Sequence, residues 1–190
     1  MVEIALIFVA VVVGVLGIAW LVRKGLGAYL QYRGERIVTC PETRKPVGVA
    51  VDAVHAAVTA PFGGPELRLK DCTRWPEREG CGQECLTQIE EAPDQCLVRT
   101  RLEKWYAGTS CVICHAPISP VRWLDHKPGV LSPEGRPRAL NELSPEELPN
   151  VLATHRRICW NCWVTASFRA EHPDMVVEDP RPFRAQPPVS

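Results

Sequence analysis

The motif with the clearest chemistry in this chain is a set of two Cys-x-x-Cys pairs, Cys111/Cys114 and Cys159/Cys162. Each pair predicts a tight turn that presents two sulfur atoms to one ion, and two such turns supply the four tetrahedral ligands of structural zinc. Four thiolates leave no open position for a substrate, so such a site stabilises a fold rather than catalysing a reaction. We therefore predict a closed zinc site here.

Four other cysteines are predicted to form a second, less regular metal site: Cys40, Cys72, Cys81 and Cys85. Cys81 and Cys85 are four residues apart and are expected on one face of a helix start, where the helix N-terminus lowers thiol pKa values and favours thiolate ligands. Zinc is the favoured occupant. The spacing leaves an iron–sulfur cluster, disulfides or free thiols as alternatives, and Cys96 is either a buried side chain or a replacement ligand.

The region from about residue 108 to residue 172 resembles a treble-clef or zinc-ribbon type domain. Cys111-Val-Ile-Cys114 resembles a zinc knuckle, a hairpin is expected after it, and Cys159-Trp-Asn-Cys162 opens a helix. This resemblance implies zinc binding but no particular activity, because treble clefs serve many functions. The Cys40-Pro-Glu-Thr and Cys81-Gly-Gln-Glu-Cys85 segments resemble those of bacterial membrane-anchored Cys-rich proteins, which also implies no activity.

Other motifs compete for the same cysteines. Cys111-Val-Ile-Cys114-His115 matches a c-type haem attachment motif, which would require a domain outside the cytoplasm and a distal ligand. Candidates for that ligand are His126, His155, His172 and Met175. The His155-x-x-x-Cys159-x-x-Cys162 segment resembles the metal motif of zinc-binding anti-sigma factors, but the anchor of those proteins follows the metal domain.

An uncharged apolar run from Ile4 to Val22 predicts a transmembrane helix. Its 19 residues, at about 1.5 Å each, span roughly 29 Å, close to the hydrocarbon thickness of a bilayer. A cleaved signal peptide would carry positive charge before the run, whereas the only charged side chain there is that of Glu3. We therefore interpret the run as a membrane anchor.

Basic residues follow the run, and they predict its orientation: Arg23, Lys24, Arg33 and Arg36. Because positive charges stay on the cytoplasmic side, we expect a single-pass protein of the inner (cytoplasmic) membrane with its N-terminus outside and its C-terminal part in the cytoplasm. That reducing compartment favours metal-bound thiolates over disulfides.

Short elements are expected to position the cysteines, so the predicted fold class is α+β: one N-terminal transmembrane helix followed by one or two small Cys-rich, metal-stapled modules of short hairpins and short helices. Strands are expected over 35–39, 46–51, 67–70, 121–125 and 129–131. Helices are expected over 52–59, 83–91, 98–106, 144–155 and 160–171. The predicted domains are an anchor with its linker (1–34), a first Cys-rich module (35–94), a treble-clef-like zinc module (95–173) and a Pro-rich tail (174–190).

Composition narrows the function. The formal net charge is zero with acidic and basic residues intermixed, so a nucleic-acid partner is not expected. No catalytic constellation is recognisable, and no small-molecule substrate is evident.

We predict a non-enzymatic, membrane-anchored zinc-binding structural or interaction protein with two zinc ions, acting as an accessory subunit or scaffold on a protein partner. The alternatives are an electron-transfer protein with an iron–sulfur cluster or c-type haem, and a thiol or metal sensor.

Overall fold

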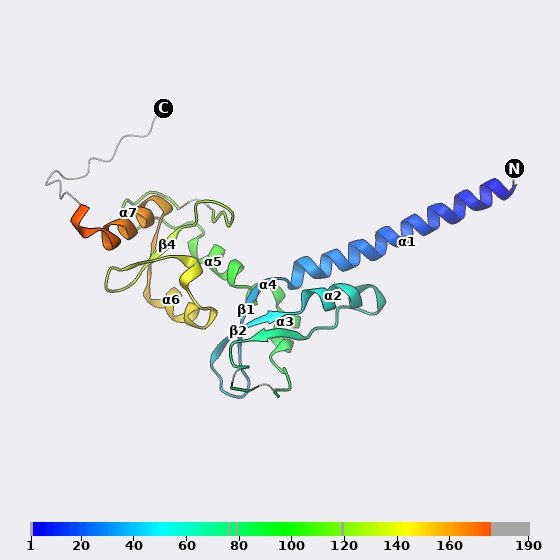
Figure 1. Ribbon diagram of the computed structural model, residues 1–190, viewed down its shortest axis with the longest axis horizontal. Coiled ribbons are helices and arrows are strands. Elements are labelled where there is room, and N and C mark those ends of the chain that lie inside the picture. The colour runs from blue at the N-terminus through cyan, green and yellow to red at the C-terminus, as the bar shows by residue number, and fades with distance from the viewer. Residues whose placement is uncertain (1, 76, 79, 119, 176–190) are drawn as a thin grey trace, which may run out of the picture. The chain divides into compact units, whose positions relative to one another are not determined.

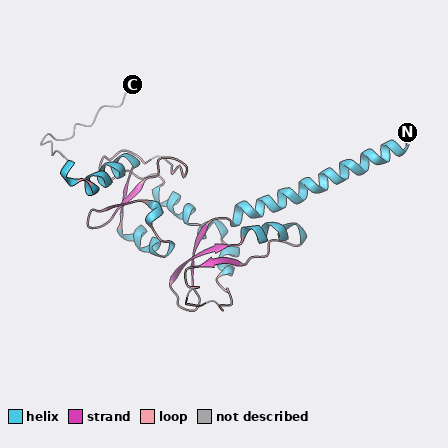
Figure 2. Cartoon of the chain, viewed as in Figure 1, coloured by secondary structure: helices cyan, strands magenta, loops and turns pink. Residues whose placement is uncertain are grey.

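The computed structural model describes residues 2–75, 77–78, 80–118 and 120–175, and they form the mixed helix-and-sheet fold that was predicted (Figures 1 and 2). The chain divides into two compact units, one made of residues 1–105 with 144–152 and the other of residues 106–143 with 153–190. The domain boundaries drawn from the sequence stay predictions. The predicted Pro-rich tail lies outside the described residues from position 176 onward.

The helices are α1 (Val2–Tyr32), α2 (Ala53–Thr59), α3 (Leu86–Glu91), α4 (Pro93–Cys96), α5 (Val98–Tyr106), α6 (Leu148–Thr154) and α7 (Trp160–Glu171). Short 3₁₀ turns are η1 (Ala60–Phe62), η2 (Leu140–Glu142), η3 (Pro145–Glu147) and η4 (Pro173–Met175). The strands are β1 (Glu35–Thr39), β2 (Pro46–Val51), β3 (Leu69–Cys72), β4 (Gly129–Leu131), β5 (Pro137–Arg138) and β6 (Arg156–Ile158).

Helix α1 is long and apolar enough to cross a membrane. It continues past Val22 to Tyr32, where the chain leaves the helix through Gly34 in the left-handed region (φ 98°). The guanidinium of Arg36 is fully buried at this end and donates to the carbonyl oxygens of Tyr32 (2.9 Å) and Gln31. Arg36 thereby caps carbonyls that have no partner within the helix.

The first unit contains the predicted hairpin, in which β1 pairs antiparallel with β2 and β3 adds to the other edge of β2. Valines of β1 and β2 pack in the buried core with Ala56 of α2 and Ile89 of α3. Asp52 caps α2 as predicted, because its side chain accepts from the backbone N–H of His55. Cys40 directly follows β1 and Cys72 ends β3, and both cysteines line one pocket.

The second unit contains a three-stranded antiparallel sheet in the order β5-β4-β6. The central strand β4 is buried along its length, and the hydroxyl of buried Tyr106 donates to the carbonyl of Gly129 at 2.7 Å. The strand expected over 121–125 is wrong: this segment is a turn, closed by the hydrogen bond from the Asp125 N–H to the Arg122 carbonyl. Both edges of β4 are already taken by β5 and β6.

Candidate metal centre

The first Cys-x-x-Cys pair lies on a tight turn. The N–H of Cys111 donates to the carbonyl of Ala116 and the N–H of His115 donates back to the carbonyl of Cys111, both at 2.9 Å. His115 adopts a left-handed conformation (φ 59°) that reverses the chain after Cys114. The turn therefore presents the sulfur atoms of Cys111 and Cys114 from one short segment.

The second pair lies where β6 enters α7. Cys159 is the N-cap residue of α7, and its carbonyl accepts the N–H of Trp163 at 2.9 Å. Cys162 follows in the first turn of the helix. The N–H of Val112 donates to the carbonyl of Arg157 at 3.0 Å, which ties the first turn to β6 and so brings the two pairs together.

The four sulfur atoms of this set converge. All lie within 4.8 Å of one another, and the Sγ atoms of Cys114 and Cys159 are 3.7 Å apart. Zinc–sulfur bonds of about 2.3 Å in a tetrahedron place neighbouring sulfurs about 3.8 Å apart. The arrangement can therefore hold one metal ion, and it is compatible with a zinc-ribbon-like module.

The electrostatics of the set favour one thiolate in the absence of a metal. Burial acts to raise the pKa of Cys111, but backbone N–H groups of Cys114, Cys159 and Ile113 donate to its sulfur and outweigh burial, so the pKa falls to about 7. Burial, together with the neighbouring thiols, raises the pKa values of Cys159 and Cys162. A bound cation would favour the thiolate form of all four cysteines, because it stabilises all the thiolates at once.

Apolar side chains pack against three of the four cysteines, Cys111, Cys159 and Cys162, whereas Cys114 is exposed. Leu131 and Ile158 are buried with Cys111, and Ile118 and Trp163 pack against that cluster. Trp163 also lies 5.0 Å from Trp160, ring centre to ring centre. Its indole contacts the backbone so closely that a methyl group at Gly129 would come within 2.2 Å of it. Because four thiolates complete a tetrahedral set, the arrangement is that of a structural site, with the Cys114 side exposed to solvent.

The second predicted set is also brought together, but less tightly. One pocket of about 290 Å³ is lined by Cys40, Cys72, Cys81 and Cys85. Among the described residues, however, these four sulfurs do not form a group as compact as the first set. The helix expected to carry Cys81 begins later, at Leu86, so Cys81 lies in the preceding loop and Cys85 is the N-cap residue.

The cysteines that line this pocket have pKa values shifted in opposite directions. Backbone donation from Thr43 is the largest of the effects that lower the pKa of Cys40 to about 7, and Arg74 adds a hydrogen bond from Nη1 to the Cys40 sulfur at 3.0 Å. Burial raises the pKa of Cys72 and raises that of Cys85 to about 11. The expected lowering at Cys85 by the helix N-terminus is therefore wrong, because burial dominates there.

Sequence reasoning missed Arg74 as part of this pocket. Besides Cys40, Arg74 contacts Glu42 at 3.2 Å, and Arg78 contacts the other carboxylate oxygen of Glu42 at 3.0 Å. The position of Arg74 two residues after Cys72 was a signal, because a residue near one ligand in sequence can reach another in space. Cys96 is buried, its thiol donates to the carbonyl of Gln88 at 3.5 Å, and it does not line the pocket.

In comparisons with protein-family models, curated proteins and solved structures, the chain matches none of them. The assignment of this centre therefore rests on its own geometry.

Proposed function

We propose that this chain is a membrane-anchored zinc protein whose treble-clef-like unit docks on a protein partner, as an accessory subunit or scaffold of a membrane-associated complex. The observation that carries the proposal is the convergence of Cys111, Cys114, Cys159 and Cys162 within 4.8 Å. The order of turn, hairpin and helix-borne pair supports the treble-clef assignment.

The anchor supports the membrane part of the proposal. Helix α1 meets the length and hydropathy of a membrane span. Basic Arg23 and Lys24 follow the apolar run, whereas acidic Glu3 precedes it. The proposed topology has the N-terminus outside and both compact units in the cytoplasm, where thiolates stay reduced.

Metal analysis of the full-length protein, purified anaerobically in mild detergent, tests the zinc assignment. We expect about one zinc ion per chain from the first centre, as for other four-thiolate structural sites. Isolation of the protein from gently solubilised membranes tests the scaffold role, since a chain that migrates alone as a monomer contradicts docking on a partner. Zinc-free protein that keeps its fold contradicts the structural site.

A second candidate function, electron transfer, is favoured by the pocket of the other four cysteines. One zinc ion needs sulfurs about 3.8 Å apart, whereas the wider arrangement around a pocket of about 290 Å³ has room for a polynuclear group. Four cysteine thiolates are the usual ligands of iron–sulfur clusters, and hydrogen bonds to sulfur tune their potentials. Arg74 already donates to Cys40, and the buried indole N–H of Trp75 has no partner among the described residues.

Paired variants separate the two centres. If the pocket holds an iron–sulfur cluster, anaerobic protein contains iron and acid-labile sulfide and has broad visible absorption that dithionite bleaches. Cys72→Ser then removes the colour and leaves the zinc content unchanged, whereas Cys159→Ser removes zinc and leaves the colour. Colourless protein with about two zinc ions per chain contradicts electron transfer and supports zinc at both sites.

A further inference from the structure

Helix α2 and the turn η1 that continues it carry an apolar face that is open to solvent. Val54, Val58 and Phe62 recur at intervals of four residues, so they lie on one side of the helix. Their relative exposures are 63%, 63% and 81%. An exposed apolar stripe of this kind indicates a contact surface.

The opposite face of α2 is buried within its own unit. Ala53 and Ala56 belong to the hydrophobic core, together with Ala28 of α1. The helices approach so closely that a methyl group at Gly25 of α1 would lie 3.0 Å from the carbonyl oxygen of Ala57. The contact with α1 therefore fixes which side of α2 is turned outward.

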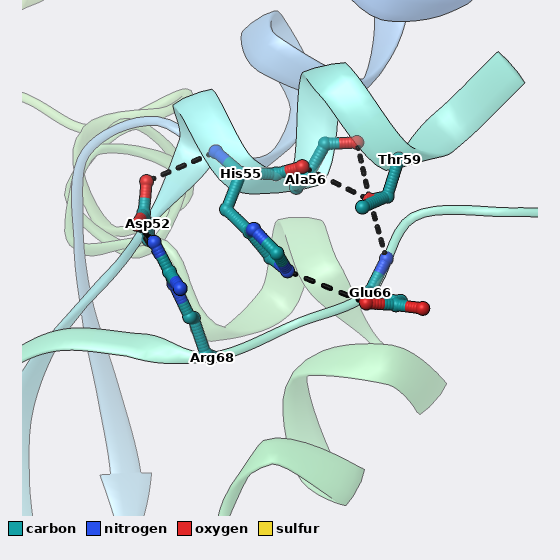
Figure 3. A network of polar contacts seen from close by, with 6 residues as sticks. All are labelled: Asp52, His55, Ala56, Thr59, Glu66 and Arg68. Carbon is teal, nitrogen blue, oxygen red and sulfur yellow. Dashed lines mark hydrogen bonds and ion pairs between the residues drawn. The ribbon is translucent and has the colours of Figure 1, made fainter.

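A polar face of α2 is tied to the chain that follows it (Figure 3). The carboxylate of Asp52 pairs with Arg68 at 2.6 Å, and the imidazole of His55 lies 3.4 Å from the carboxylate of Glu66. The N–H of Glu66 donates to the hydroxyl of Thr59 at 2.9 Å. The core face and the polar face of α2 thus contact other residues of the same unit, and the apolar face is exposed to solvent.

The direction of α2 brings its end to the predicted membrane boundary. Its first residues pack beside Ala28, its middle lies beside Gly25, and the loop after it lines a pocket with Trp20, Arg23 and Lys24. Helix α2 therefore runs beside α1 toward the apolar span (Figure 1). Trp20 lies within the last turn of the predicted span, and Ala60 and Pro61 of η1 line the same pocket as Trp20.

We propose that the tip of α2, formed by Val58, Pro61 and Phe62, inserts into the interfacial region of the bilayer that α1 crosses. This inference rests on the membrane anchoring proposed above. Apolar side chains held at headgroup depth are buried by lipid, and Arg23 and Lys24 at the same level attract anionic headgroups. Val54 lies about 12 Å farther along the helix from Phe62 and remains in water.

This second contact gives the first unit a defined orientation at the membrane. A single helix leaves a domain free to rotate about the helix axis, whereas an inserted tip beside that helix restricts rotation. The sheet that carries Cys40 and Cys72 is packed on the same core as α2. The cysteine pocket would therefore keep one orientation relative to the bilayer surface.

The test places an environment-sensitive fluorescent amino acid at position 13, 54, 58 or 62 of the full-length protein, reconstituted in vesicles of phosphatidylcholine and phosphatidylglycerol. Lipids brominated on the acyl chains should reduce the fluorescence at positions 13, 58 and 62 and leave position 54 unchanged. Aqueous iodide should quench position 54 alone. Phe62→Glu should abolish bromolipid quenching at position 58, whereas the matched control Val54→Glu should not.

The outcomes distinguish this inference from the anchor on which it rests. Quenching at position 13 without quenching at position 62 overturns tip insertion and leaves the anchor intact. No bromolipid quenching at position 13 overturns the anchor and the insertion together. A position 62 that is shielded from iodide in native membranes, yet unaffected by brominated lipid, assigns the surface to a protein and contradicts the lipid contact.

Discussion

The sulfur atoms of Cys114 and Cys159 lie 3.7 Å apart although the two residues are 45 positions apart in the chain. A contact of this kind closes a long loop, and closing it costs chain entropy that a metal–thiolate bond can offset. Each of the two cysteines also lies at the end of a local element, one on a turn and the other on a helix N-cap. The contact therefore joins two rigid pieces of the second unit.

Replacement of one of these sulfurs is expected to release the metal. Cys159→Ser should remove the zinc and lower the free energy of unfolding of the second unit by several kcal/mol, because apparent binding free energies of structural zinc reach about 10–16 kcal/mol. Elemental analysis and thermal unfolding of the full-length protein measure both effects. Cys96→Ala, outside both sets, is the matched control and should keep its zinc. A Cys159→Ser protein with a full complement of zinc would be incompatible with the site.

Local patterns made much of this arrangement predictable. Helices α5 and α7 begin and end near the predicted residues because apolar periodicity and the position of Cys159 are local signals. The prediction for residues 121–125 fails for a local reason, although the alternation of Val121 and Trp123 resembles a strand. The ion pair of Arg122 with Asp125, at 2.8 Å, stabilises a turn instead.

Contacts that depend on how the side chains pack in space could not be predicted from the sequence. Arg36 was interpreted only as a cytoplasmic charge, yet its side chain is fully buried against the end of α1. Nothing in the local sequence shows that a charge will cap carbonyls two to five residues earlier in the chain. The wider spacing of the second cysteine set likewise depends on how β1, β3 and the loop before α3 meet in space.

His115 distinguishes a metal-binding turn from haem attachment. Its left-handed conformation costs roughly 1–2 kcal/mol for a residue with a side chain. His115→Gly should relieve that cost, which the greater freedom of glycine in the unfolded chain partly offsets. We expect stability to be unchanged or raised by up to about 1 kcal/mol, with full zinc content.

The haem alternative makes the opposite prediction for the same variant, because His115 would then be an axial ligand of the iron. A haem spectrum in the wild-type protein that is lost in His115→Gly would support haem attachment and contradict zinc. His115→Val provides a stability control, since a β-branched side chain is least compatible with a positive φ. It should be less stable than wild type in chemical unfolding.

Close packing of Gly129 on Trp163 predicts a large effect of one added methyl group. In Gly129→Ala, the new carbon would lie 2.2 Å from the indole, so Trp163 must move away from the sulfur cluster. Overpacking of this kind typically costs about 1–3 kcal/mol. Equilibrium unfolding and zinc affinity should both decline. In a double-mutant cycle, Trp163→Ala should cost less in the Gly129→Ala background than in wild type, and strict additivity would contradict the contact.

The attachment of α2 predicts a dependence of stability on pH. Asp52 accepts from the N–H of His55 and from Arg68, and these bonds lower the pKa of its carboxyl group below the ordinary value. A lowered pKa in the folded state means that the stabilisation is complete above the pKa of the unfolded chain and is lost as pH falls through the folded value. Asp52→Asn should therefore reduce the thermal stability at neutral pH, and its difference from wild type should shrink in acid. Asp71→Asn, an exposed aspartate of β3, is the control and should follow the wild-type profile. A constant difference between Asp52→Asn and wild type at every pH would show that the charge of Asp52 does not hold α2 in place.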